Sequence, residues 1–288
     1  MTVSTNVSTV LALGTQRLRA CAGAHTVASA ALDAGLLLAH ALQMTRARLM
    51  SHTELAVEPA AARCYSALIE RRARGEPLAY LTGTQEFWSL ALRVSRAVLV
   101  PRPETELLVE RALALRGAPH GRVVDLGTGS GAVALAIASE RPHWQVTATD
   151  VSAEALAIAR ANAVQLKLTA IDFRHGNWFT PLAGTRFDLI VSNPPYVAAD
   201  DPALEEPALA HEPRLALTPG ADALACLRVI ARGAQPHLNP GGWLLLEHGN
   251  DQGAAVRDEL VLAGLRYVRS HGDLAGHERI TEGQYDPL

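Results

Sequence analysis

The segment 123–150 combines a short apolar run, a glycine-rich turn, an apolar helix and a second apolar run that ends in an acid. The turn reads Asp125-Leu126-Gly127-Thr128-Gly129-Ser130-Gly131, and the helix runs from Ala132 to about Ser139. The second run is Val146-Thr147-Ala148-Thr149-Asp150. A strand, turn, helix and strand joined so closely predict an α/β fold, with a ligand site beyond the carboxyl ends of the strands.

The spacing of the glycines bears on which ligand binds at this turn. Asp150 can accept both hydroxyls of a ribose, and an Asp about 20 residues past such a turn also fits a dinucleotide site. The glycines, however, are spaced Gly-x-Gly-x-Gly, and Asp125 stands where pyrophosphate binders usually carry an apolar residue. A carboxylate there repels a pyrophosphate and attracts a cationic amino acid, which favours S-adenosylmethionine. We expect the cofactor to bind at Asp125, Gly127, Thr128, Gly129, Ser130, Gly131 and Asp150.

A second motif, Asn193-Pro194-Pro195-Tyr196, directly follows the apolar run Phe187-Asp188-Leu189-Ile190-Val191-Ser192. A bare Pro-Pro most simply turns the chain. Here the prolines fix φ at about −65°, so the Asn193 side chain and the Pro194 carbonyl are held as two acceptors. With the Tyr196 ring as a stacking face, this corner suits a planar –NH2 group on an sp2 carbon. We therefore expect Asn193, Pro194, Pro195 and Tyr196 to form the catalytic corner, and Asn193 also to contact the cofactor.

Hydrophobic periodicity divides the chain into three parts. Residues 1–83 are expected to form a small helical domain, with helices from Val7 to Ala20, Thr26 to Gln43 and Glu58 to Arg74. Residues 84–103 predict a β-hairpin linker. Residues 104–288 alternate between strands and helices, which predicts a mostly parallel sheet covered on both faces. The expected strands lie near 121–126, 144–149, 170–174, 187–192, 241–247, 264–270 and 278–285.

Composition argues against several functional classes, although a local basic patch is compatible with it. The 288 residues are 49% hydrophobic and carry a net charge of −3, without the basic character of most nucleic-acid binders. Cys21, Cys64 and Cys226 lack Cys-x-x-Cys spacing, so we expect reduced, packed thiols and no metal site. The sequence shows neither a secretion signal nor an apolar run of about 18 residues. We therefore expect a cytoplasmic protein that does not bind membranes.

Beyond these motifs, the chain resembles the class I S-adenosylmethionine-dependent methyltransferases, and within them the enzymes that methylate the glutamine amide of peptide-chain release factors. The resemblance extends over most of the chain. It rests on both motifs and on the segments 75–83 (Gly-Glu-Pro-Leu-Ala-Tyr-Leu-Thr-Gly), 87–90 (Phe-Trp-Ser-Leu), 100–106 (Val-Pro-Arg-Pro-Glu-Thr-Glu), 245–249 (Leu-Leu-Glu-His-Gly) and 278–280 (Glu-Arg-Ile).

The resemblance implies a Rossmann-like fold with a mostly parallel seven-stranded sheet, whose reversed last strand runs from Ile280 to Tyr285. It also implies methylation of the glutamine side-chain amide in the Gly-Gly-Gln motif of release factors, during translation termination. Release factors would then be the protein partners, positioned by the N-terminal domain. We expect a monomer without stable nucleic-acid binding. The resemblance places Trp178 in the adenine pocket, although core packing is the simpler alternative for a loop tryptophan.

Two other functions fit the same motifs. An adenine-specific nucleic-acid methyltransferase meets an equally flat –NH2 group, on a base that must be flipped out of its stack. A cofactor-binding regulatory module would keep the glycine turn without catalysis. The absence of a sizeable basic domain disfavours the first alternative, and the intact Asn-Pro-Pro-Tyr motif disfavours the second.

Three further groups of residues carry side chains that can serve a function. Arg71, Arg72 and Arg74 are expected to end a helix before Gly75 rather than to contact RNA. Glu247 and His248, at the end of an apolar run, fit a general base and a structural role equally well and receive no catalytic role. For the segment 211–214 (His-Glu-Pro-Arg), in a long loop after the Asn-Pro-Pro-Tyr corner, we expect substrate contact, with ordered loop packing as the alternative.

Overall fold

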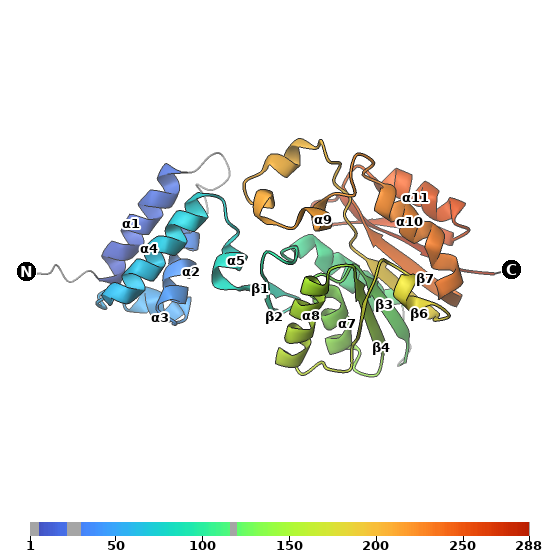
Figure 1. The fold of residues 1–288 in the computed structure, drawn as a ribbon, viewed down its shortest axis with the longest axis horizontal. Coiled ribbons are helices and arrows are strands. Elements are labelled where there is room, and N and C mark those ends of the chain that lie inside the picture. The colour runs from blue at the N-terminus through green and yellow to red at the C-terminus, as the bar shows by residue number, and fades with distance from the viewer. Residues whose placement is uncertain (1–5, 22–29, 116–119, 288) are drawn as a thin grey trace, which may run out of the picture. The chain divides into compact units, whose positions relative to one another are not determined.

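The computed structural model describes residues 6–21, 30–115 and 120–287. The chain forms two compact units, drawn in Figure 1. The smaller unit contains the first 83 residues together with Glu206–His211, and the larger contains Thr84–Glu205 and the chain from Glu212 onward. Within the described ranges, no helix is long and apolar enough to cross a membrane.

The smaller unit is helical, as the apolar spacing predicts. Its helices are α1 (Val7–Ala20), α2 (Ala30–Ala41), α3 (Arg46–Ser51), α4 (Pro59–Ala73) and α5 (Leu78–Thr82). The predicted start of the second helix at Thr26 lies outside the described residues. One core holds the helices together, including the fully buried Leu37, Leu38 and Leu49.

Two ion pairs in this unit explain the arginines at the end of α4. Arg72 Nε donates to Asp33 Oδ2 at 2.8 Å, and Arg71 forms a two-point contact with Glu76 at 2.7 and 2.8 Å. Gly75, with φ of +91°, follows the last turn of the helix. The prediction that these arginines end a helix is therefore confirmed.

A hairpin opens the larger unit. Strands β1 (Thr84–Phe87) and β2 (Leu90–Arg93) pair antiparallel, and Trp88 and Ser89 form the turn with φ of +51° and +59°. The hairpin ends at Arg93, short of the expected limit of the linker at residue 103. Residues 94–102 continue without a strand to a short 3-10 helix, η1 (Pro103–Thr105).

Strands and helices then alternate to the end of the chain. They are α6 (Glu106–Leu115), β3 (Arg122–Leu126), α7 (Ala132–Glu140), β4 (Gln145–Asp150), α8 (Ala153–Gln165), β5 (Asp172–His175), β6 (Phe187–Ser192), α9 (Arg214–Leu217), α10 (Ala225–Ala234), β7 (Leu238–Glu247), α11 (Gly253–Leu262), β8 (Arg266–Gly272) and β9 (Glu278–Gln284). The seven-stranded sheet has the order β5-β4-β3-β6-β7-β9-β8. Only β9 is reversed, which confirms the predicted mostly parallel sheet with a reversed last strand.

Alternating side chains give the sheet a separate core on each face. Val123 of β3 and Val191 of β6 pack with α6 and α7, whereas Val124 and Ile190 pack with α10 and α11. Figure 1 shows α7 and α8 on one side of the sheet and α10 and α11 on the other. Because both faces are covered there, the central strands β3 and β6 and the second half of β7 are mostly apolar and buried.

Candidate active site

Strand register places three of the predicted site residues side by side. Leu126 of β3 pairs with Thr149 of β4 and with Ser192 of β6. The residues that follow these three along the chain are Gly127, Asp150 and Asn193. They therefore lie next to one another at the edge of the sheet formed by the carboxyl ends of the strands. This edge is where the strand order reverses, the usual position of a ligand site in an open parallel sheet.

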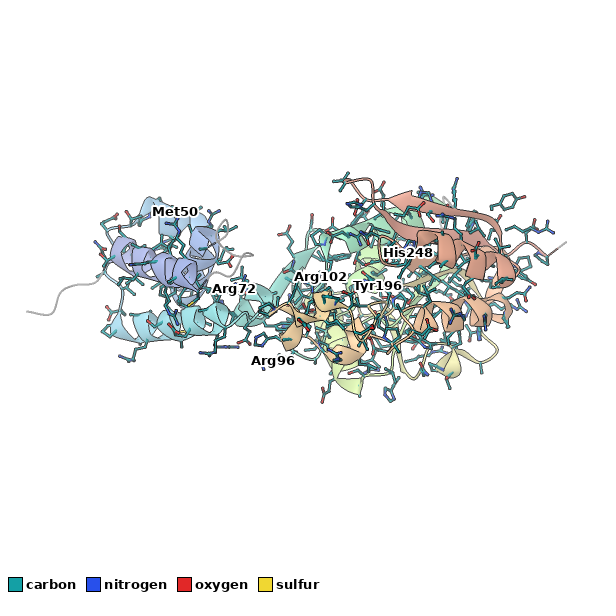
Figure 2. All side chains as sticks on the ribbon, turned by 90° about the horizontal axis from the view of Figure 1, so that it is seen from above. Met50, Arg72, Arg96, Arg102, Tyr196 and His248 are labelled. Atoms are coloured by element: carbon teal, nitrogen blue, oxygen red, sulfur yellow. The ribbon has the colours of Figure 1, made fainter. Side chains whose placement is uncertain are left out.

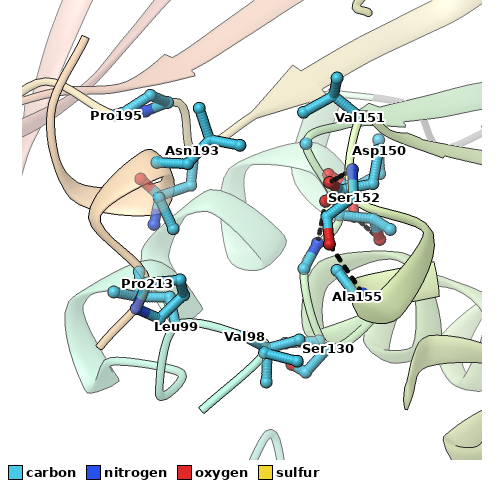
Figure 3. Close-up of a pocket in the computed structure, with 18 of the residues that line it drawn as sticks. Val98, Leu99, Ser130, Asp150, Val151, Ser152, Ala155, Asn193, Pro195 and Pro213 are labelled. Carbon is cyan, nitrogen blue, oxygen red and sulfur yellow. Dashed lines mark hydrogen bonds between the residues drawn. The ribbon is translucent and has the colours of Figure 1, made fainter. Parts of the chain in front are cut away.

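A cavity of about 500 Å³ lies at this edge (Figure 3). Its size suits a nucleoside-containing ligand. Among the predicted site residues, the structure brings to its wall Asp125, Gly127, Thr128, Gly129, Ser130, Asp150, Trp178, Asn193 and Pro195. Gly131, Pro194 and Tyr196 do not line the cavity.

Asp125 is a buried carboxylate at the start of the glycine turn, with 2% of its surface exposed. Its Oδ2 accepts hydrogen bonds from Thr128 Oγ1 at 2.6 Å and from Ala134 N at 3.2 Å. Burial raises the pKa of Asp125 to about 7, because these hydrogen bonds only partly offset the loss of water. A cationic group entering the cavity would stabilise the ionised form of this carboxylate.

Asp150 closes the opposite side of the glycine turn. Its Oδ2 accepts from Gly129 N and its Oδ1 from Ser152 N, both at 2.8 Å. Burial raises its pKa, and the two backbone donors act in the opposite direction. Each oxygen has a further lone pair, so the carboxylate remains able to accept ribose hydroxyls.

The last two glycines of the turn face different surroundings. A Cβ on Gly129 would meet nothing within 4 Å, because this residue faces open space at the cavity. A Cβ on Gly131, where φ is +86°, would lie 3.0 Å from Leu135 Cδ1 and 3.2 Å from Ala159 Cβ. Gly131 therefore allows α7 and α8 to pack closely and takes no place on the cavity wall.

Trp178 lies over the glycine turn. A Cβ on Gly127 would be 3.3 Å from the Trp178 ring, so the ring and the backbone of the turn are in close contact. Thr149 Oγ1 donates to the Trp178 carbonyl at 3.4 Å, which ties the loop to the end of β4. The ring is both part of the cavity wall and packed against the core, so the two interpretations of this tryptophan are compatible.

Asn193 is held by a residue that sequence reasoning did not assign. Its Nδ2 donates to Thr105 Oγ1 at 3.2 Å, across 88 positions of the chain. Thr105 ends η1 and is 4% exposed. The segment 100–106, which carries part of the family resemblance, thus contributes a hydroxyl to the site.

Tyr196 points away from the cavity into a polar contact. Its hydroxyl donates to Glu247 Oε1 at 3.2 Å, and its carbonyl accepts from Gln252 Nε2 at 2.9 Å. Figure 2 shows Tyr196 and His248 among the elements of the larger unit. His248 is fully buried and bonds Thr281 Oγ1 at 2.8 Å, in keeping with a structural role. Glu247, by contrast, is connected to the catalytic corner through Tyr196, which its position at a strand end did not reveal.

The loop segment 211–214 contains a structural tie. Glu212 is 6% exposed, and its Oε2 accepts from Val100 N at 3.0 Å while Oε1 pairs with Arg102. Pro213, the next residue, lines the cavity (Figure 3). Glu212 therefore holds two parts of the cavity wall together, and the substrate contact expected for 211–214 stays a prediction.

Across residues 6–21, 30–115 and 120–287, no cluster of His, Cys, Asp and Glu suits a metal ion. Cys21, Cys64 and Cys226 are free thiols, but Cys21 and Cys64 are exposed. The expectation of packed thiols is wrong for these two, because Cys21 caps the end of α1 and Cys64 lies on an exposed face of α4.

Comparisons with known proteins support the same interpretation of fold and site. Residues 103–222 match the methyltransferase small domain, and residues 9–83 match the PrmC N-terminal domain. A methyltransferase structure from Pyrococcus furiosus has a TM-score of 0.53 at 20% identity, and the likeness covers 76% of this chain and 99% of that one. At this identity the likeness supports the fold alone. Together, the fold, the cavity and the matched domains define a class I S-adenosylmethionine-dependent methyltransferase.

Curated relatives narrow the class to one family. The release factor glutamine methyltransferase of Xylella fastidiosa strain Temecula1 is 55% identical over 254 residues, covering 88% of this chain and 92% of the relative. Those of Pseudomonas aeruginosa and Vibrio cholerae are 50% and 47% identical, each covering 89% of this chain and at least 90% of the relative. The chain belongs to the release factor glutamine methyltransferase family.

Proposed function

We propose that this enzyme transfers a methyl group from S-adenosylmethionine to the side-chain amide nitrogen of the glutamine in the Gly-Gly-Gln motif of peptide-chain release factors. One observation carries the proposal: Asn193 lies on the wall of the cavity that the glycine turn and Asp150 also line. An acceptor for a flat amide thus stands beside the candidate methyl-donor site. The names of relatives 47–55% identical to the chain support this substrate.

The residues of the cavity fit S-adenosylmethionine, which supplies a methyl group on a sulfonium when bound. Asp125 is buried, and the only hydrogen bonds it accepts from the described residues end on Oδ2. It would therefore gain a charge partner in the ammonium of the cofactor. Asp150 would accept the ribose hydroxyls, and Trp178, Gly127, Thr128, Gly129 and Ser130 would surround the adenosine. Gly131 would act indirectly, through the packing of α7.

The catalytic corner compensates for the weak nucleophilicity of an amide nitrogen, whose lone pair is delocalised into the carbonyl. The Asn193 side-chain oxygen and the Pro194 carbonyl would accept the two amide hydrogens, and so stabilise positive charge that develops on nitrogen. Alignment of the nitrogen with the methyl group provides the remaining rate advantage. The proton leaves late, to water. Pro195 contributes rigidity and shape.

The role of Tyr196 as a cover for the amide plane stays a prediction. In this structure its ring packs against the core formed with α10 and α11, and its hydroxyl contacts Glu247. The Gln252 contact to its backbone carbonyl fixes the position of the corner after Pro195.

The remaining expectations concern partners and location. We propose that the helical domain of residues 1–83 positions the release factor, while residues 104–288 carry out catalysis and 84–103 link the two. We also propose a cytoplasmic monomer without stable nucleic-acid binding, which the net charge of −3 supports.

Mass spectrometry of a release factor incubated with the enzyme and labelled cofactor tests this function. We expect one methyl group on the Gly-Gly-Gln peptide, none on a factor carrying Gln→Ala in that motif, and none with Asn193→Ala enzyme. DNA and RNA serve as parallel substrates. Label in a nucleic acid alone would move the assignment to the adenine methyltransferases. A release factor left unmodified by enzyme that binds the cofactor would refute the proposal.

A further inference from the structure

An asparagine at the catalytic corner has two chemically opposite ends. The amide of Asn193 must present Oδ1, an acceptor, to the hydrogens of a substrate –NH2 group. A rotation of 180° about the last side-chain bond would present Nδ2, a donor, and would repel the same group. Because the two orientations have nearly the same shape, packing alone does not select between them. A hydrogen-bonding partner has to do so.

Thr105 is that partner. In the structure Asn193 Nδ2 donates to Thr105 Oγ1 at 3.2 Å. A threonine hydroxyl both donates and accepts, however, so it would bind either end of the amide. Thr105 selects the productive orientation only if its own hydrogen is directed elsewhere. Thr105 lies on the wall of the cavity but is only 4% exposed, so an acceptor in the protein interior has to take that hydrogen.

Glu247 is the acceptor within reach. It is 2% exposed, and its Oε1 already accepts from Tyr196. Oε2 is buried and has no hydrogen-bond partner among the described residues. The Thr105 hydroxyl lowers the pKa of Glu247, which identifies Thr105 as the neighbour that can supply a donor to this unpaired oxygen. An ionised carboxylate only accepts, so it would draw the Thr105 hydrogen toward itself.

We propose that Thr105 and Glu247 are positioning residues that set the amide orientation of Asn193. Glu247 accepts the hydroxyl hydrogen of Thr105, the Thr105 oxygen accepts from Asn193 Nδ2, and Asn193 Oδ1 is left facing the substrate. No bond is made or broken in this relay. The inference rests on the proposed role of Asn193, and it adds two residues to the catalytic corner that act on the substrate amide through Asn193.

The relay depends on the charge of Glu247. The pKa of Glu247 is raised to about 7, chiefly by burial and in small part by Glu104, while Thr105, Tyr196 and Arg279 act in the opposite direction. Below this pKa the carboxyl carries its own hydrogen and no longer requires one from Thr105. The selected orientation of Asn193 is therefore present above about pH 7 and is lost as the pH falls through that value.

Substitutions of Thr105 provide the first test, with cofactor and release factor both saturating. Thr105→Val keeps the shape and removes the hydroxyl, and we expect kcat to fall roughly 10- to 100-fold with the KM for cofactor changed less than about threefold. Thr105→Ser should restore most of the rate. Thr147→Val, a buried threonine of β4 outside the cavity, is the matched control. An equal loss of kcat in Thr105→Ser and Thr105→Val, or no loss of kcat in Thr105→Val, would overturn the proposal.

The pH profile of kcat provides the second test. We expect an acid limb near pH 7 in the wild type and its absence in Glu247→Gln, which has a lower rate that no longer depends on ionisation. Because the cofactor is saturating, titration of Asp125 does not contribute to this limb through cofactor affinity. An unchanged limb in Glu247→Gln would contradict the relay.

A third measurement separates this inference from the proposed substrate. The side-chain NH2 resonances of Asn193, assigned by their loss in Asn193→Ala, report its amide orientation without turnover. We expect them to shift with a midpoint near pH 7 in the wild type and to be independent of pH in Glu247→Gln and Thr105→Val. Such a result upholds the relay even if release factor is not methylated, and pH-independent resonances in the wild type would refute it even if it is.

Discussion

At the scale of single residues, this site is governed by carboxylates held away from water. Asp125 and Glu247 are each 2% exposed, and burial raises the pKa of both to about 7. Isolated charges in such surroundings are costly unless a partner compensates them. For Asp125 that partner would come from the ligand, and for Glu247 it consists of neighbouring hydroxyls. Titration of these two acids should therefore affect different properties of the enzyme: cofactor affinity for Asp125 and the methyl-transfer rate for Glu247.

Cofactor affinity should depend on the ionisation of Asp125. A nearby ammonium lowers the pKa of this carboxyl, so binding releases a proton below about pH 7 and affinity falls up to about tenfold per pH unit below it. Above that pH the affinity should level off until the α-amino group of the cofactor itself begins to lose its proton, at about pH 8. Calorimetric titration of the enzyme with S-adenosylmethionine between pH 5.5 and about 8.5 measures this.

Asp125→Asn is the matching variant, because it keeps the shape and removes the charge. We expect its affinity for the cofactor to be about 10- to 100-fold weaker at pH 8 and nearly independent of pH. A variant that binds as tightly as the wild type, or that keeps the acid dependence, would show that Asp125 does not meet the cationic end of the cofactor.

A sequence reveals a site residue more readily when the contacts that place it are local or follow from the strand topology. Asp125, Asp150 and Asn193 each end an apolar strand, so local pattern and topology suffice to place them together. Thr105 meets Asn193 across 88 positions, and Glu212 meets Val100 across 112. Such contacts leave no periodic signal, because they depend on how two loops approach each other in the folded unit. Glu247 was visible as a strand end, but its contact with Tyr196 was not.

At the scale of elements, the glycine turn combines a binding function with a packing function. Gly129 faces open space, whereas Gly131 stands between α7 and α8. Substitutions at these positions should therefore affect different properties, although both residues have positive φ. The spacing of the glycines predicts a tight turn, but only the packed structure distinguishes their roles.

Gly129→Ala and Gly131→Ala form a matched pair. In Gly131→Ala the added methyl group crowds Leu135 and Ala159, and we expect a loss of about 2–3 kcal/mol in unfolding free energy. In Gly129→Ala we expect a loss of about 1 kcal/mol from backbone strain and a cofactor affinity reduced more than about tenfold. Urea denaturation and calorimetric titration measure the two effects. Similar losses of stability in both variants would contradict the assigned roles.

The tie between Glu212 and residues 100–102 is a second feature of element scale. Glu212→Gln removes the charge opposite Arg102 and weakens the acceptor for Val100 N. We expect a loss of about 1–3 kcal/mol in unfolding free energy, together with weaker cofactor binding, because both segments line the cavity. Glu205→Gln, at an exposed position of the same loop, is the control and should have no effect. Equal stability of the two variants would argue against a structural tie.

At the scale of the whole molecule, the chain contains two units with separate cores. One core joins α1 to α5, and the others lie on the two faces of the sheet. Units that each bury their own apolar surface can unfold independently. The cofactor site is built from residues of the larger unit alone, so a ligand bound there should stabilise that unit directly.

Scanning calorimetry of the full chain should therefore resolve two transitions. S-adenosylmethionine at about 100 times its Kd should stabilise the larger unit by about 2.7 kcal/mol and leave the other transition in place. Asp33→Ala should do the reverse, because it leaves Arg72 without its partner in the helical core and lowers only the helical transition, by roughly 3 kcal/mol. A single transition that shifts under both changes would show that the two units are energetically coupled. The helical domain would then stabilise the catalytic site, rather than act as an independent module that holds the substrate.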